Sequence, residues 1–99
     1  SIKSEFIPCI HSYDILVKTA EWLINRNILK VPIESGYKRY LVNREPKHRS
    51  GESFTAPRKL SNGWRIETHY STKSCIRNAK HLLKECGLRE EDLTVHDFS

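Results

Sequence analysis

The sequence predicts a small single α+β domain, in which a helix is followed by a two- or three-stranded antiparallel sheet and a second, amphipathic helix. The chain has 99 residues, 37% of them apolar, which is enough for one compact core and too little for two. The Asn62-Gly63 dipeptide is typical of a two-residue hairpin turn with positive φ angles. After it, Trp64 to Tyr70 alternates large or apolar residues with charged ones, which indicates a strand.

The first helix is expected to begin at Ser12 and to end near Asn27. The Ser12 hydroxyl can accept a hydrogen bond from the first turn, and Asp14 lies near the positive end of the helix dipole. Residues 1–11 have no clear period and contain Pro8, which argues against the interior of a helix. We therefore expect 1–11 to form an N-terminal arm and 12–99 to form the α+β domain.

The strands are expected in the middle of the chain. Residues 29–34 contain Pro32 and should form an edge strand or a linker, because proline cannot donate to a ladder. Residues 37–42 are rich in aromatic and β-branched types that favour strands. Residues 54–60 should pair with 64–70 through the turn.

Two details qualify this sheet. Pro57 must lie on a free edge or at a bulge of its strand. The polar segment 43–53, which contains Pro46 and Gly51, is expected to be a mobile loop.

The second helix is expected between a cap at Ser71 or Thr72 and a closing Gly87. At 100° per residue its apolar side chains gather on one side, and four cations lie within an arc of about 60° on the other. Together these cations extend along about 16 Å of helix, which matches the reach of several successive phosphates. They are Lys73, Arg77, Lys80 and Lys84.

The overall charge favours a polyanionic partner. Seventeen lysines and arginines oppose twelve acids, which gives a formal net charge of +5. Four acids fall in the last ten residues, so the middle of the chain is more basic than the total implies. We expect binding to nucleic acid, with DNA slightly preferred over RNA.

The location is expected to be intracellular, either cytoplasmic or nuclear. Cys9, Cys75 and Cys86 are too few and too scattered for a disulfide framework, and no apolar run is long enough for a membrane span. No membrane partner is therefore expected. The chain has no methionine and starts at Ser1, which fits a domain excised from a longer protein and joined to a partner domain, covalently or not.

The predicted nucleic-acid-binding surface is centred on the second helix and extends over cations of the loop and the hairpin. Phosphate contacts from such residues fix the register of a ligand without reading its sequence. Of the aromatic residues, Trp64 is expected to pack in the core, and Tyr37 is the favoured exposed ring. The candidate binding residues are Lys73, Arg77, Lys80, Lys84, Arg65, Lys47, Arg49, Arg58 and Lys59.

Catalysis is less well supported by the sequence. His48, Glu52 and His69 are the available acid–base groups, and a histidine in a basic loop could protonate a leaving oxygen in RNA cleavage. No spacing brings them together, and no set of cysteines and histidines has zinc-ligand spacing. No catalytic residue, metal or cofactor is therefore expected.

The order of the elements and the ending Leu82-Leu83-Lys84-Glu85-Cys86-Gly87-Leu88 resemble small RNA-targeting toxins of the HicA type. The resemblance implies a fold like that of double-stranded-RNA-binding domains. The Gly-Ser-His motif of these toxins corresponds to Ser35-Gly36-Tyr37, which has no histidine, so no catalytic residue is carried over.

We expect a nucleic-acid-binding domain, most simply the DNA-recognition part of a larger DNA-processing or regulatory protein. Two alternatives stay open: a small ribonuclease of toxin type that uses His48 or His69, and a protein-interaction module with a basic surface.

Overall fold

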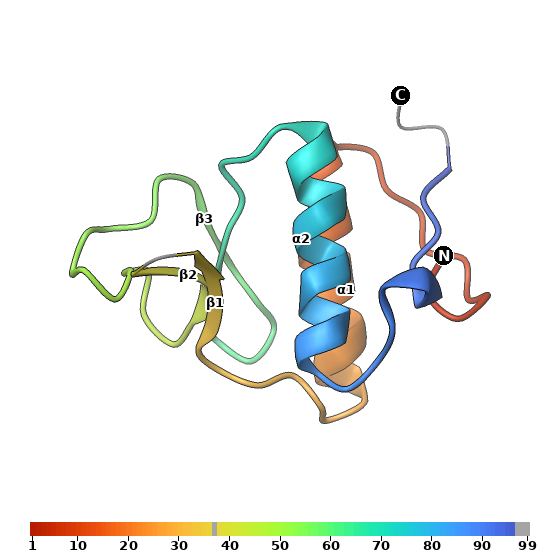
Figure 1. Ribbon diagram of the computed structural model, residues 1–99, viewed down its shortest axis with the longest axis horizontal. Helices are drawn as coiled ribbons and strands as arrows, with labels where there is room; N and C mark the ends of the chain where they lie inside the picture. Colours follow the sequence, from red (N-terminus) through yellow and green to blue (C-terminus); the bar gives the residue numbers. More distant parts are fainter. Residues whose placement is uncertain (37, 97–99) are drawn as a thin grey trace.

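Two helices pack on one face of a four-stranded antiparallel sheet, which confirms the predicted α+β class (Figure 1). The computed structural model describes residues 1–36 and 38–96, so the predicted exposed ring of Tyr37 lies outside the described residues. The elements are α1 (Ser12–Asn25), β1 (Ile33–Gly36), β2 (Arg39–Asn43), β3 (Pro57–Lys59), β4 (Arg65–Glu67), α2 (Thr72–Glu85) and the 3-10 turn η1 (Glu90–Asp92).

Local hydrogen bonds fix where both helices begin. α1 follows His11, and the carboxylate of Asp14, rather than the hydroxyl of Ser12, accepts the N–H of His11 at 3.0 Å. Burial opposes ionisation of this carboxyl, but its backbone hydrogen bonds outweigh burial and lower the pKa of Asp14. α2 begins as predicted, because the Ser71 hydroxyl accepts the N–H of Ser74 at 3.2 Å.

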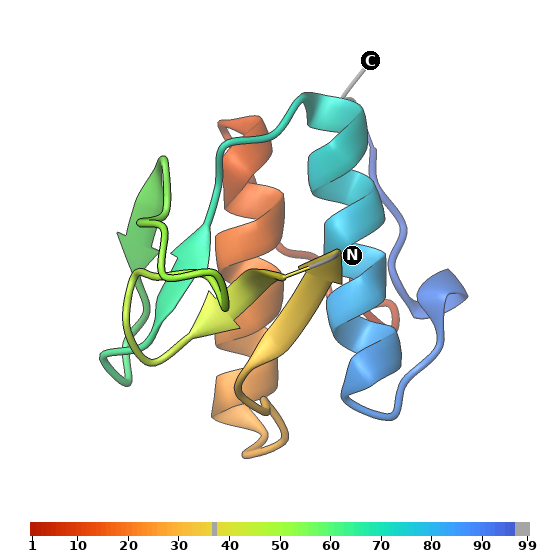
Figure 2. The same ribbon diagram turned by 60° about the vertical axis from the view of Figure 1, so that its left-hand side comes forward.

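The sheet has the order β1-β2-β4-β3, with every neighbouring pair antiparallel (Figure 2). It has more strands than the two or three predicted, because Ile33–Gly36 pairs with β2 as an edge strand. Ile33 faces Val42 and Glu34 faces Tyr40, which leaves one extra residue in β2 and produces a bulge. At the other edge, β3 begins with Pro57, where the missing N–H interrupts no ladder.

The turn between β3 and β4 lies where the sequence predicted it, but it has three residues instead of two. The N–H of Leu60 donates to the carbonyl of Trp64 at 2.8 Å, so residues 61–63 form the loop. Gly63 has a φ of 90°, whereas Asn62 accepts the N–H of Trp64 through its side chain at 3.0 Å. Three-residue hairpin loops of this kind need a single left-handed residue, which glycine supplies.

The core fills the space between the sheet and the two helices. Trp64 packs against it partly buried, as predicted. Burial of each large apolar side chain stabilises the fold by about 1.5–3 kcal/mol. The large, fully buried side chains at the centre of the core are Leu16, Leu23, Leu41, Val42, Ile66, Leu82 and Leu83.

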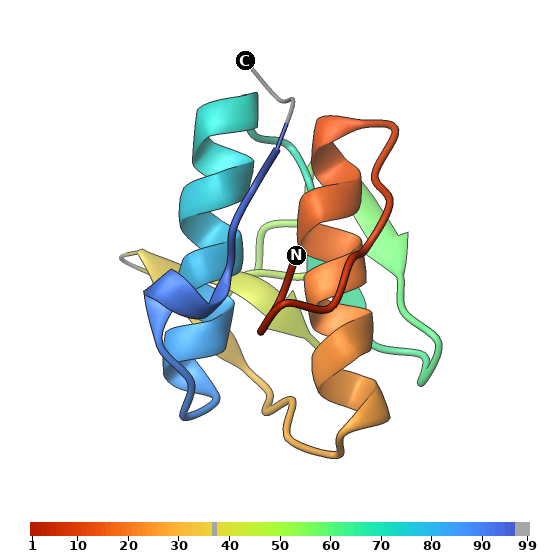
Figure 3. The same cartoon turned by 90° about the vertical axis from the view of Figure 1, so that its right-hand side faces the viewer.

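The terminal segments lie on the side of the helices that faces away from the sheet (Figure 3). The predicted arm is part of the packed domain, because Ile2 is buried and forms a bridge with Leu93. The N–H of Lys3 also donates to the carbonyl of Asp92 at 2.8 Å. The molecule is therefore layered from the loop 44–56 through the sheet and the helices to the paired termini.

Candidate nucleic-acid interface

The four cations of α2 occupy one face of the helix, and three of them are exposed to solvent. Lys73, Arg77 and Lys84 are exposed, and Lys80 is half-buried. The opposite side buries Cys75, Ala79, Leu82 and Leu83 in the core. Since α2 lies in front of α1 in Figure 1, the face turned away from α1 is free of other elements. We call the four cations Lys73, Arg77, Lys80 and Lys84 the α2 stripe.

Little local charge compensates the α2 stripe. Within residues 1–36 and 38–96, no carboxylate lies within 4.0 Å of the charged group of any of the four side chains. Arg77 donates to the hydroxyl of Ser74 at 3.1 Å, which leaves most of its donors for a ligand. Glu85 is the one acid in the helix, and its oxygen lies 3.8 Å from His81 instead.

A charged cleft of about 580 Å³ lies between α2 on one side and β1 with Lys38 on the other. The ring of His81 donates to the carbonyl of Glu34 at 2.7 Å, and this bond ties the helix to the edge of the sheet. Arg49 reaches the cleft from the loop 44–56, with 4.0 Å between its Nη1 and Glu34 Oε1. Arg77 lines the same cleft, so two predicted binding residues from distant segments meet here.

The other predicted cations lie elsewhere. Arg58 and Lys59 belong to β3, three strands away from β1 and therefore about 14 Å across the sheet. The guanidinium of Arg58 lies 4.2 Å from the centre of the Tyr13 ring, on the side of α1. Arg65 is half-buried and donates to the carbonyl of Gly63. The expected continuous surface from α2 over the hairpin is thus interrupted by the sheet.

The loop 44–56 is anchored on the outer face of the sheet rather than extended into solvent. The N–H of His48 donates to the carbonyl of Glu52, and that of Phe54 donates to Pro46, both at 2.8 Å. The Phe54 side chain is buried beside the ring of His48, with 4.7 Å between ring centroids. Lys47 and Arg49 are exposed on this anchored loop.

The anchor is the carboxylate of Glu67, which is 1% exposed. Its Oε2 accepts the N–H of Thr55 at 2.7 Å, and its Oε1 accepts the N–H of Ala56 at 2.8 Å. The N–H groups of Thr68 and His69 also donate to Oε1, at 3.1 and 3.3 Å. Burial opposes ionisation of Glu67, but these backbone hydrogen bonds prevail, so the pKa of Glu67 lies below its usual range.

His48 completes this anchor and is not available as a surface acid or base. Its Nδ1 accepts the N–H of Tyr40 at 3.0 Å, and its Nε2 lies 3.6 Å from Glu67 Oε2. The His48 residue is 4% exposed. The sequence predicted His48 in a mobile loop and gave no indication that Glu67, within the predicted strand 64–70, holds that loop. The one sequence feature that could have indicated this anchoring is Phe54, an apolar residue that follows a polar segment and whose side chain is buried.

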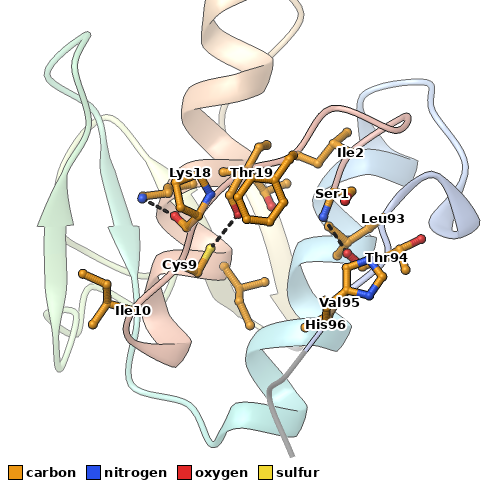
Figure 4. A pocket seen from close by; sticks show the side chains of 14 residues that line it. Ser1, Ile2, Cys9, Ile10, Lys18, Thr19, Leu93, Thr94, Val95 and His96 are labelled. Carbon is orange, nitrogen blue, oxygen red and sulfur yellow. Dashed lines mark hydrogen bonds between the residues drawn. The ribbon is translucent and has the colours of Figure 1, made fainter.

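A second cavity of about 320 Å³, lined by both apolar and polar side chains, lies beneath the arm, between α1 and the C-terminal segment (Figure 4). Ile2, Ile15 and Leu93 contribute to its lining, and exposed Phe6 and Ile10 stand at its rim. Lys18 donates to the carbonyl of Pro8 there. Burial raises the pKa of the Cys9 thiol, which also lines the cavity. None of the nine predicted binding residues lines it.

In the part of the chain that the structure describes, no three His, Cys, Asp or Glu side chains gather in the way that metal ligands do. No helix among these residues is both long and apolar enough to span a bilayer. Comparison with protein-family models, curated proteins and solved structures finds no match for the chain.

Proposed function

We propose that this chain is a nucleic-acid-binding domain, with the α2 stripe as its main phosphate contact. The observation that carries the proposal is the row of solvent-facing cations along one helix face, three exposed and one half-buried, none of which has a carboxylate partner among the described residues. A cation in an ion pair must give up its carboxylate before it binds a phosphate, which costs free energy. The cations of the α2 stripe have no described carboxylate to give up. Arg49 lines the same cleft as Arg77, but it differs from the α2 stripe because a carboxylate, that of Glu34, lies 4.0 Å from its Nη1.

The proposal implies a strong dependence of binding on salt. Each phosphate neutralised by a lysine or arginine releases condensed counterions, so four contacts should give a slope of about −3 to −4 in log K against log salt concentration. Binding through these contacts is insensitive to base sequence, because phosphates carry no sequence information.

The test reverses the four charges of the α2 stripe with K73E, R77E, K80E and K84E combined. A matched variant, K3E, K30E, R44E and R89E combined, has the same net charge but changes exposed residues that are not among the candidate binding residues. We expect the first variant to lose on the order of 100-fold in affinity for oligonucleotides of about 20 residues at about 0.15 M salt, and the second to lose far less. Fluorescence anisotropy with single- and double-stranded DNA and RNA measures both.

Two controls make the result interpretable. Circular dichroism checks that each variant is folded, and the four-glutamine version of the first variant removes charge without adding repulsion. Equal loss in both charge-reversed variants would show that net charge alone attracts the ligand, and retained affinity in a folded first variant would exclude the α2 stripe.

The ribonuclease alternative gains no support from the geometry of His48. A general acid must reach its substrate within hydrogen-bond distance, and the His48 ring is covered by the loop and bonded to Tyr40. His69 is exposed. Incubation with RNA, compared between the natural protein and H69A, tests this remaining histidine, and cleavage that depends on His69 would revive the alternative.

A further inference from the structure

We infer that the charged cleft beside α2 receives an unpaired nucleobase, with preference for bases that carry exocyclic amino groups. This inference rests on the proposed nucleic-acid binding and adds a specificity to it. The cleft reads the base, while the α2 stripe holds the phosphates.

The first support is the position of the cleft along the helix surface. Arg77 belongs both to the α2 stripe and to the cleft lining. Next to it around the helix come His81, Glu85 and Asn78, at about 40°, 80° and 100° from Arg77, and all three line the cleft. A nucleic-acid backbone that follows the α2 stripe therefore runs along the rim of the cleft.

The second support is the mixed charge of the cleft walls. Besides Arg77, the lining combines carboxylates with cationic and amide donors, which come from Glu34, Glu85, Glu90, Lys38, Arg49 and Asn78. The carboxylates offset the cations of the cleft, so a phosphate is attracted there less than to the α2 stripe, where no described carboxylate lies within 4.0 Å of the cations. A nucleobase is neutral, and its amino groups need acceptors of the kind that Glu34 and Glu85 offer.

The third support is that these carboxylates are only loosely engaged. Glu34 Oε1 lies 4.0 Å from Arg49, and Glu85 Oε1 lies 3.8 Å from His81 Nε2, both beyond hydrogen-bond distance. Their side chains are 63% and 49% exposed. Among the described residues neither carboxylate accepts a hydrogen bond, so both have acceptor oxygens to offer a ligand.

The shape of the site restricts this contact to unpaired bases. In a duplex the bases are stacked and can enter a lateral cleft only after extrusion, which costs a few kcal/mol. In a single strand they are free to turn outward while the phosphates stay on the cations. The cleft volume of about 580 Å³ falls in the range of small-molecule binding sites.

The test compares two single strands of equal charge, oligodeoxycytidine and oligodeoxythymidine of about twelve nucleotides, at neutral pH and about 0.15 M salt. Cytosine offers an amino group where thymine offers a carbonyl. We expect the natural protein to bind oligodeoxycytidine about 5- to 10-fold more tightly, since one good base contact is worth about 1 kcal/mol or more.

The decisive variant is E34Q combined with E85Q, because the amides keep the shape of the carboxylates but offer donors as well as acceptors. We expect it to lose the preference for cytosine while binding thymidine strands at least as well as the natural protein, since negative charge has been removed. The matched control, E45Q with E91Q, changes exposed acids that do not line the cleft and should keep the preference.

The outcomes separate this inference from the proposed function. Equal binding of the two strands by the natural protein, or a preference that survives in E34Q/E85Q, would overturn the role of the cleft and leave phosphate binding intact. No binding of either single strand by the natural protein, while duplex DNA or RNA still binds, would overturn the inference alone, and no binding of any of these nucleic acids would overturn the proposed function as well.

Discussion

The outer face of the sheet and the outer face of α2 both carry charged side chains, yet their surroundings differ completely. Glu67 on β4 is buried and accepts four backbone N–H groups. Lys84 on α2 is exposed, and no described carboxylate pairs with it. The comparison teaches that a charge with all its hydrogen-bond partners inside the protein maintains the fold, whereas a charge with none is available to a ligand.

The largest effect on stability is expected from removing the buried charge of this comparison, the carboxylate of Glu67. Glu67→Ala leaves four backbone N–H donors without their acceptor, so the free energy of unfolding should fall by about 3 kcal/mol. Urea denaturation measures it. Glu52→Ala, in the same loop but exposed, is the control and should change stability by less than about 0.5 kcal/mol. A small effect of Glu67→Ala would break the comparison.

The same carboxylate should make stability depend on pH. The pKa of Glu67 is lowered in the folded protein, so its contribution is complete above the ordinary glutamate pKa and is lost as pH falls through the folded pKa. The natural protein should therefore exceed Glu67→Gln in stability at about pH 6, and this difference should shrink toward about pH 3. A difference that stays constant over this range would show that the Glu67 charge is not the cause.

An intermediate effect is expected at the start of α2. Ser71→Ala removes the acceptor for the N–H of Ser74 and should lower the free energy of unfolding by about 1 kcal/mol. Thermal unfolding followed by circular dichroism measures it. Ser71→Asp restores an acceptor and should recover stability. Because the cap lies outside the α2 stripe, salt dependence of binding should be the same in Ser71→Ala as in the natural protein.

The smallest effect on stability is expected on the α2 stripe itself. Lys84→Gln removes an exposed charge that pairs with no carboxylate in the described part of the chain, so stability should change by less than about 0.5 kcal/mol. The slope of log K against log salt should nevertheless become shallower by about 1. If Lys84→Gln destabilised the protein as much as Glu67→Ala does, the assignment of the α2 stripe to binding would be wrong.

The sequence predicted what depends on neighbours in the chain. The cap at Ser71, the glycine that ends α2 and the arc of the α2 stripe follow from helix geometry, which acts over a few residues. The position of the β3–β4 turn was also correct, because Gly63 marks it locally. Its three-residue form was missed, since either loop length fits the same dipeptide.

What the sequence did not predict depends on distant partners. Burial of Glu67 requires Thr55 and Ala56, and the cleft requires a bond between His81 and Glu34, 47 residues apart. The separation of Arg58 and Lys59 from α2 follows from the strand order, in which β3 joins β4 instead of β2. Periodicity carries no information about strand order, so a single cationic surface was expected where the structure has two regions.

The two edges of the sheet bear on how the protein behaves at high concentration. Open strand edges are templates on which other chains can add strands and aggregate. At β3 the edge begins with Pro57 and exposes two cations, which would repel the same edge of another molecule. At β1 the carbonyl of Glu34 is already bonded to His81. His81, whose bond to Glu34 holds α2 beside the sheet edge at the cleft, thus also protects the sheet from growing by self-association.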